Sequence, residues 1–140
     1  MKCAAAALLL LICGLLLAGC GDTTSPADQP FPNQLTLGTG ANGFNLTGQT
    51  TSFTRVGGTV TIYWRLQSQE DMAGSTVEIR VDQLTGGSYA PYDSIFTPNP
   101  QNYGHIMVAS FPWTAAGSFR GTGILVNSGS VVASQAFTVQ

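Results

Sequence analysis

The residues best suited to chemistry are few and dispersed along the chain. His105 is the only histidine, so a hydrolytic triad would need it as the general base for an activated serine. The sequence contains neither a G-x-S-x-G turn nor an S-x-x-K motif, and its one lysine is Lys2. A zinc site would need further histidine or cysteine ligands. We therefore expect no enzyme activity and no zinc site, and we expect His105 in a loop or at a strand end.

Carboxylates offer a second kind of site, because calcium binds oxygen ligands alone. The candidates are Glu70, Asp71, Asp82 and Asp93, but no D-x-D-x-D-G loop contains them. We interpret them as solvated acids and predict no metal and no cofactor. A structural calcium ion is the alternative.

A glycine motif at residues 38–43 matches the G-x-G-x-x-G pattern of dinucleotide-binding loops. No helical pattern follows it, and no acid lies about 20 residues further on, where Ile62 and Tyr63 stand. We predict a glycine-rich loop between strands rather than a nucleotide site.

The amino terminus carries the pattern of an export signal. Lys2 precedes an uncharged apolar run at residues 4–18, and small residues follow it. The run is about 15 residues long, shorter than the roughly 20 that a membrane-spanning helix needs, and it fits a signal peptide helix. The cysteines, Cys3, Cys13 and Cys20, all lie in this part of the chain.

The tetrapeptide Leu17-Ala18-Gly19-Cys20 resembles the lipobox of bacterial lipoproteins at every position. The resemblance implies cleavage between Gly19 and Cys20, a diacylglycerol thioether on Cys20, and membrane anchoring by two or three acyl chains. Gly21, rather than an aspartate, follows Cys20, which by resemblance favours the outer membrane, or the outer face of the cytoplasmic membrane in a one-membrane cell. An ordinary signal peptide and a single-pass membrane helix are the alternatives.

Three segments follow from this interpretation: a lipoprotein signal peptide at 1–19, a lipidated cysteine with a flexible tether at 20–33, and one domain at 34–140. With Cys20 lipidated, no disulfide can form in the mature chain, so packing and sheet hydrogen bonds must hold the domain. Charged residues make up 9% of the chain and its net charge is −2, which excludes a basic nucleic-acid-binding face.

Strand patterns fill the domain. At residues 59–66 and 76–82, apolar and polar residues alternate, which places the apolar ones on one face of each strand. We expect these two runs to form an antiparallel pair in which Arg65 faces Glu78 across the strands.

The chain ends in a predicted hairpin. Two strands within residues 118–140 flank the turn-forming segment Asn-Ser-Gly-Ser at 127–130. Gly121 and Gly123 lie on one face of the first strand, and we expect them to leave room for a bulky neighbour such as Trp64.

Weaker strand signals occur at residues 35–37, 44–53 and 106–111. About seven short strands separated by turns predict an all-β fold, an antiparallel β-sandwich. The pattern resembles an immunoglobulin-like domain of the bacterial surface type in its central strand at 60–64, late strand at 116–120 and closing strand at 132–139. The cysteine pair of antibody domains is absent. A jelly-roll or a carbohydrate-binding sandwich is the alternative.

The aromatic residues Tyr89, Tyr92, Tyr103 and Trp113 lie in a proline- and glycine-rich stretch at 86–117. Such rings either pack at the ends of a sandwich or present a surface to a partner. We predict a lipid-anchored, non-catalytic binding or structural module of the cell envelope that meets an envelope protein or a glycan. The alternative is a glycan-binding module that uses these aromatics, and a hydrolase ranks third.

Overall fold

The computed structural model describes residues 31–100 and 104–140. The predicted signal peptide, the lipidation site Cys20, most of the tether and Tyr103 lie outside the described residues. Among the residues described, no helix is long and apolar enough to span a bilayer.

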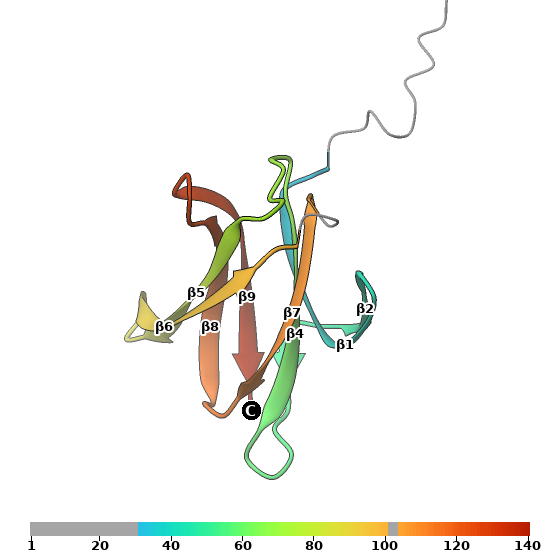
Figure 1. Cartoon of the computed structure of the whole chain (residues 1–140). Coiled ribbons are helices and arrows are strands. Elements are labelled where there is room, and N and C mark those ends of the chain that lie inside the picture. Colours follow the sequence, from blue (N-terminus) through green and yellow to red (C-terminus); the bar gives the residue numbers. More distant parts are fainter. Residues whose placement is uncertain (1–30, 101–103) are drawn as a thin grey trace, which may run out of the picture.

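Two β-sheets pack face to face (Figure 1). The four-stranded sheet has the order β2-β1-β4-β7, formed by β1 (Gln34–Asn42), β2 (Asn45–Gln49), β4 (Val60–Gln67) and β7 (Ile106–Trp113). The five-stranded sheet has the order β3-β9-β8-β5-β6, formed by β3 (Ser52–Phe53), β5 (Thr76–Thr85), β6 (Ser88–Pro98), β8 (Gly117–Leu125) and β9 (Ser130–Val139). All neighbours are antiparallel except β3 and β9. The prediction of an all-β fold is confirmed, with more strands than expected.

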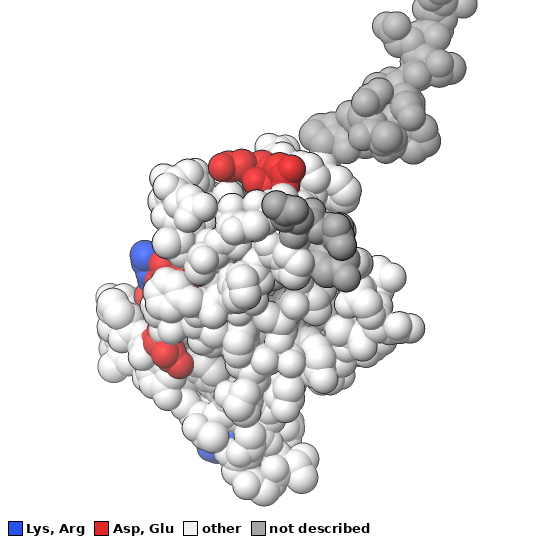
Figure 2. Space-filling model, viewed as in Figure 1, with Lys and Arg blue, Asp and Glu red and all other residues white. Residues whose placement is uncertain are grey.

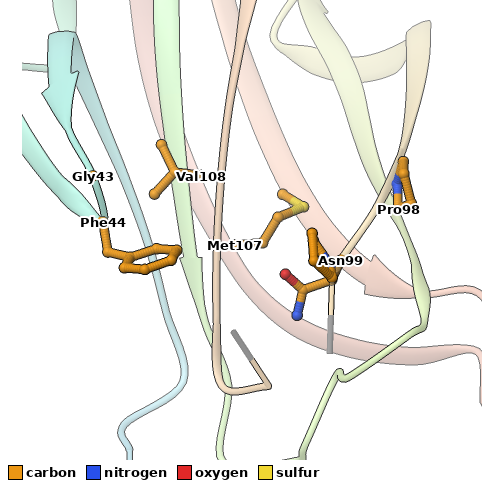
Figure 3. Close-up of a pocket in the computed structure, with 7 residues that line it drawn as sticks. Gly43, Phe44, Pro98, Asn99, Met107 and Val108 are labelled. Atoms are coloured by element: carbon orange, nitrogen blue, oxygen red, sulfur yellow. The ribbon is translucent and has the colours of Figure 1, made fainter. Parts of the chain in front are cut away.

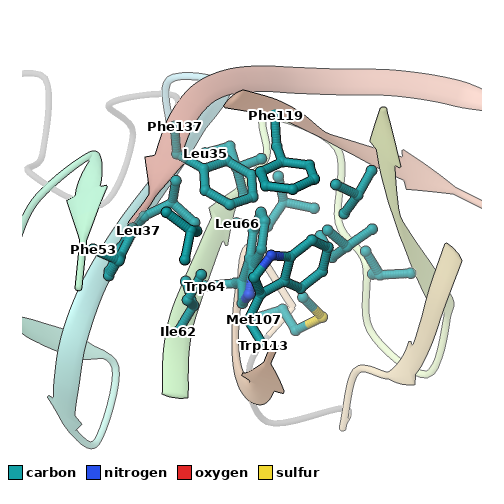
Figure 4. Packing of buried hydrophobic residues seen from close by; sticks show 14 of the residues in the cluster. Leu35, Leu37, Phe53, Ile62, Trp64, Leu66, Met107, Trp113, Phe119 and Phe137 are labelled. Atoms are coloured by element: carbon teal, nitrogen blue, oxygen red, sulfur yellow. The ribbon is translucent and has the colours of Figure 1, made fainter. Parts of the chain in front are cut away.

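The core lies between the sheets and comes from the period-two pattern of the strands (Figure 4). From β4, Ile62, Trp64 and Leu66 point inward, and all three are fully buried. Burying one such side chain stabilises a fold by about 1.5–3 kcal/mol. The buried cluster comprises Leu35, Leu37, Phe53, Ile62, Trp64, Leu66, Met72, Val77, Ile79, Val81, Met107, Trp113, Phe119, Leu125, Phe137 and Val139.

The carboxy-terminal hairpin forms as predicted, with β8 paired to β9 and a register shift between Gly123 and Ile124. A Cβ atom built on Gly121 would clash with the Trp64 ring, and one on Gly123 would lie 2.5 Å from Cδ1 of Leu66. The expectation that these glycines leave room for a bulky neighbour is therefore confirmed, with Trp64 beside Gly121 and Leu66 beside Gly123. Because they have no side chain, β8 can approach the opposite sheet closely.

The predicted pairing of residues 59–66 with 76–82 is wrong. These runs form β4 and β5, which belong to different sheets. Both turn an apolar face to the same core from opposite sides, so they contact through side chains and not through a ladder. Arg65 accordingly donates from Nε to the Phe44 carbonyl at 2.8 Å and does not meet Glu78.

Two stretches in which no strand was predicted form strands. Most of the glycine motif at 38–43 lies in β1, which turns into β2 at Gly43, where φ is +59°. Residues 88–98 form β6 in spite of two prolines, because β6 is an edge strand whose outer side needs no backbone donors. The predicted strand at 44–53 divides into β2 and β3.

Candidate functional site

The edge strand β6 carries the exposed aromatic residues of the predicted surface. Among the described residues it pairs with β5 alone, and no described strand borders its other side. The register slips where Val81 pairs with Asp93 while the next residue, Asp82, pairs with Pro91. Tyr92 is therefore the extra residue of a β-bulge, and a bulge redirects the side chain that it carries.

The bulge turns the ring of Tyr92 inward, toward the aromatic rings of the core. Its centroid lies 5.4 Å from that of Trp113 and 5.3 Å from that of Phe119. Tyr92 nevertheless keeps 46% of its surface exposed. Tyr92 therefore packs against two core rings and remains half-exposed to solvent.

Trp113 does not belong to the exposed surface that the sequence predicted. Only 4% of it is exposed, and its ring packs edge-on against Phe119 and Phe137. It ends β7 opposite Val60 with its side chain on the inner face, which explains its burial. This placement corrects the assignment of Trp113 to a partner surface, and Tyr103 lies outside the described residues.

Tyr89 lies on the outer face of the five-stranded sheet, beside a charged pair. The guanidinium carbon of Arg120 stands 4.3 Å from the ring centroid of Tyr89. Arg120 also donates from Nη2 to Oδ2 of Asp82 at 2.8 Å, and the Asp82 side chain is nearly buried. Asp82 thus holds the guanidinium over the ring, in a cation–π arrangement.

A second polar group lies on the same face, one row nearer the start of β5. Arg80 donates to both carboxylate oxygens of Glu78 at 3.3 Å, and the Ser94 hydroxyl donates to the same carboxylate at 2.9 Å. This part of the outer face therefore carries two ion pairs, Arg120 with Asp82 and Arg80 with Glu78, and Tyr89 lies beside the first of them.

The remaining residues considered for chemistry have structural contacts. The ring of His105 stacks on Phe31 at 4.9 Å, and its Nδ1 lies 3.0 Å from the Ser68 carbonyl. Asp71 accepts from the Ala73 backbone, and Asp93 accepts from the Ser94 backbone. Within residues 31–100 and 104–140, no three histidine, cysteine or acidic residues are grouped so that they could hold a metal.

A cavity of about 400 Å³ lies between the β1–β2 turn and the start of β7; its lining residues are Gly43, Phe44, Pro98, Asn99, Pro100, Met107 and Val108. Figure 3 shows Phe44 and Val108 on one side of the β7 backbone and Met107 and Asn99 on the other. Neighbouring strand residues point to opposite faces, so the cavity wraps around the free edge of β7. Its lining is mainly apolar and suits van der Waals contact rather than catalysis.

Partial burial lowers the pKa of the Arg65 guanidinium, which donates to the Phe44 carbonyl.

The sequence did not predict two features of this surface. The contact of Arg120 with Asp82 and Tyr89 depends on the order of β6, β5 and β8 in the sheet, which period-two patterns do not specify. The inward turn of Tyr92 depends on the bulge, for which Pro91 was the only sequence signal. No protein-family model and no curated protein matches this chain.

Proposed function

We propose that this chain is a lipid-anchored, non-catalytic binding module of a bacterial cell envelope. The observation that carries the proposal is the tetrapeptide Leu17-Ala18-Gly19-Cys20 directly after an uncharged apolar run. The first strand of the sandwich begins at Gln34, a short distance beyond Cys20. The anchor would concentrate the domain at the outer membrane, or at the outer face of the cytoplasmic membrane in a one-membrane cell.

A non-catalytic role is supported by the contacts of the residues best suited to chemistry. Phe31 stacks on one face of the His105 ring, and Nδ1 of His105 lies within hydrogen-bond distance of the Ser68 backbone carbonyl. Asp82 is held by Arg120. These contacts are typical of residues that stabilise a fold.

The partner surface in this proposal includes Tyr89 and Tyr92. Both rings are exposed and both are held by neighbours, Tyr89 by Arg120 and Tyr92 by the rings of Trp113 and Phe119. A ring that is already fixed loses little conformational entropy on binding, and tyrosine is frequent at protein interfaces. An envelope protein is the partner that we favour.

A glycan is the second candidate partner. The ring of Tyr89 lies beside the guanidinium of Arg120 and the carboxylate of Asp82, which supply hydrogen-bonding groups next to an apolar face. Sugars are bound by this combination of a ring and a few fixed polar groups.

The sandwich is immunoglobulin-like in this proposal. Three placements support that assignment. Trp64 is fully buried on a central strand, Phe119 points inward from the late strand β8, and β9 lies beside β8 in the five-stranded sheet.

Replacement of the lipidated cysteine tests the anchor. We expect Cys20→Ser to move the protein from the membrane fraction to the soluble fraction, whereas Ser25→Ala in the tether should leave it in the membrane. Retention of the Cys20→Ser protein in the membrane would contradict the proposal.

The partner surface is tested with Tyr89→Ala, using Tyr63→Ala on the other sheet as the matched control. Crosslinking to envelope proteins and co-sedimentation with purified peptidoglycan serve as the two readouts, alongside the melting temperature. If Tyr89→Ala, but not Tyr63→Ala, loses crosslinking, the partner is an envelope protein; if it loses co-sedimentation, the partner is a glycan. Equal behaviour of both variants in both readouts would exclude this surface.

A further inference from the structure

Four apolar residues gather at one corner of the outer face of the five-stranded sheet. Across the strands, Phe96 lies opposite Glu78, Glu78 opposite Ile124, and Ile124 opposite Val131. Phe96 and Val131 are 60% and 62% exposed, and Val126, just beyond β8, is also exposed, whereas Ile124 is buried. We call Phe96, Ile124, Val126 and Val131 the apolar corner. Large exposed apolar side chains that gather in this way mark a contact surface.

The apolar corner lies at the end of the sandwich where the tether enters (Figure 1). Gln34 begins β1 opposite Gln67, the last residue of β4. The Val126 amide donates to the Thr76 carbonyl at 3.1 Å, which places the β8–β9 turn beside the β4–β5 connection that follows Gln67. The tether and the apolar corner therefore share one end of the molecule.

Two contacts fix the point at which the tether leaves this end. Phe31 stacks on His105 with an angle of 15° between the rings. The backbone N–H of Gln69 donates to Oδ1 of Asn33 at 2.7 Å. The eleven Cα–Cα steps from Cys20 to Phe31 span at most about 40 Å when the chain is fully extended. A lipid on Cys20 would therefore keep this end of the domain near the bilayer.

We propose that the apolar corner rests against the lipid bilayer that holds the anchor, an inference that depends on the proposed lipid anchor. The side chains of Phe96, Val126 and Val131 would enter the interfacial layer of the membrane. Acyl chains on Cys20 attach the protein to the membrane, and the contact of the apolar corner determines the orientation of the domain relative to the bilayer. The tyrosines Tyr89 and Tyr92 lie further along β6 from this end and stay available to a partner.

The next row of the sheet suits the headgroup layer. Arg80 follows Glu78 by two residues on β5, its side chain is half-exposed, and it lies opposite Ser94 and Thr122. Arg80 is paired with Glu78, so this row offers the phosphates of a bilayer the exposed part of a guanidinium and neighbouring hydroxyl groups when the apolar residues enter its surface.

Acidic side chains at the same end restrict the lipid class. Glu70 and Asp71 are exposed in the β4–β5 connection. Figure 2 shows acidic side chains at the end where the chain enters. An anionic surface would repel them, so the surface that fits is mainly zwitterionic, and added anionic lipid should weaken the contact.

The mature chain offers a direct test, because its only cysteine is the one that would be lipidated. We would label V131C with an environment-sensitive fluorophore in the lipidated protein on phosphatidylcholine vesicles. The matched control is V56C, at the opposite end of the sandwich, where Val56 is 85% exposed. We expect a blue shift and reduced quenching by iodide at position 131 and none at position 56. Both effects should diminish as phosphatidylglycerol is added.

A second variant tests the residues of the corner. Phe96→Ser is an exposed change that should leave the fold intact and abolish the blue shift at position 131. Unchanged emission at position 131 on vesicles, with the protein still co-floating, would overturn the membrane contact and leave the anchor in place. A shift seen only in native membranes would also overturn it, in favour of a protein partner. Failure of the wild-type chain to co-float would overturn the anchor and the contact together.

Discussion

The indole ring of Trp64 occupies the space in which a side chain at Gly121 would lie. A Cβ atom at Gly121 would lie 2.9 Å from Cη2 of Trp64 and nearer still to Cζ3. Both residues are buried at the centre of the sandwich, one in each sheet. The absence of a side chain on β8 thus determines how closely the two sheets approach.

Gly121→Ala should destabilise the domain by about 1–3 kcal/mol, because the extra methyl group overpacks the core against a ring that has no free volume. Chemical denaturation measures the change. Trp64→Phe in the Gly121→Ala background should recover part of the loss, since the smaller ring leaves room for the methyl group. Ser134→Ala, on the outer face of β9, should stay within about 0.5 kcal/mol of the wild type. Additive losses for the Gly121→Ala and Trp64→Phe pair would show that the ring does not limit this position.

The contact between Trp64 and Gly121 also shows how far the sequence can predict this fold. Alternation along β4 and β8 identifies the face that each residue occupies, and a glycine on an apolar face implies a large neighbour. Alternation does not specify which strand lies beside which. The pairing of β4 with β5 was therefore predicted wrongly, although both inner faces were correct. In the same way, the sequence around Tyr92 and Trp113 did not reveal which of the two rings is buried. Their burial depends on the bulge in β6 and on the position of β6 at the edge of its sheet.

Trp113→Ala should destabilise the fold by about 3–5 kcal/mol, because it removes a buried ring that packs against Phe119 and Phe137. The indole N–H of Trp113 is buried without a hydrogen-bond partner among the described residues. Trp113→Phe keeps an aromatic ring and removes this donor, so it should cost less than about 1.5 kcal/mol.

Tyr92→Ala is the matched control, because this ring covers Trp113 from outside and is half-exposed. We expect a loss smaller than that of Trp113→Ala in thermal unfolding. An equal loss for the two variants would contradict the assignment of Trp113 to the core and Tyr92 to its edge.

Arg120 should couple energetically to both Tyr89 and Asp82. A double-mutant cycle with Tyr89→Ala and Arg120→Met should give a coupling of about 0.5–1 kcal/mol, typical of an exposed cation–π pair. A cycle of Asp82→Asn with Arg120→Met should give a coupling of similar size that falls as the ionic strength rises, because the Arg120 side chain of this pair is partly exposed and its charge is screened. A Tyr89 coupling that falls equally with salt would indicate that Tyr89 contributes no contact of its own.

The free edge of β6 should be protected from pairing with a second chain. Pro91 has no backbone donor, the bulge at Tyr92 bends the strand, and the Ser94 amide donates to Oδ1 of Asp93 at 2.8 Å. Each of these features removes or misdirects a backbone group that an added strand would use.

The double variant P91T/D93T tests this protection, because it restores a backbone donor at position 91, frees the Ser94 amide and removes a charge. We expect it to fold with nearly unchanged stability but to associate as its concentration rises, as measured by analytical ultracentrifugation. Ser94→Thr on the same strand raises β-propensity while keeping all three features, and it should stay monomeric. If P91T/D93T also stays monomeric, Pro91 and Asp93 do not protect the edge, and the twist of the sheet alone prevents pairing with a second chain.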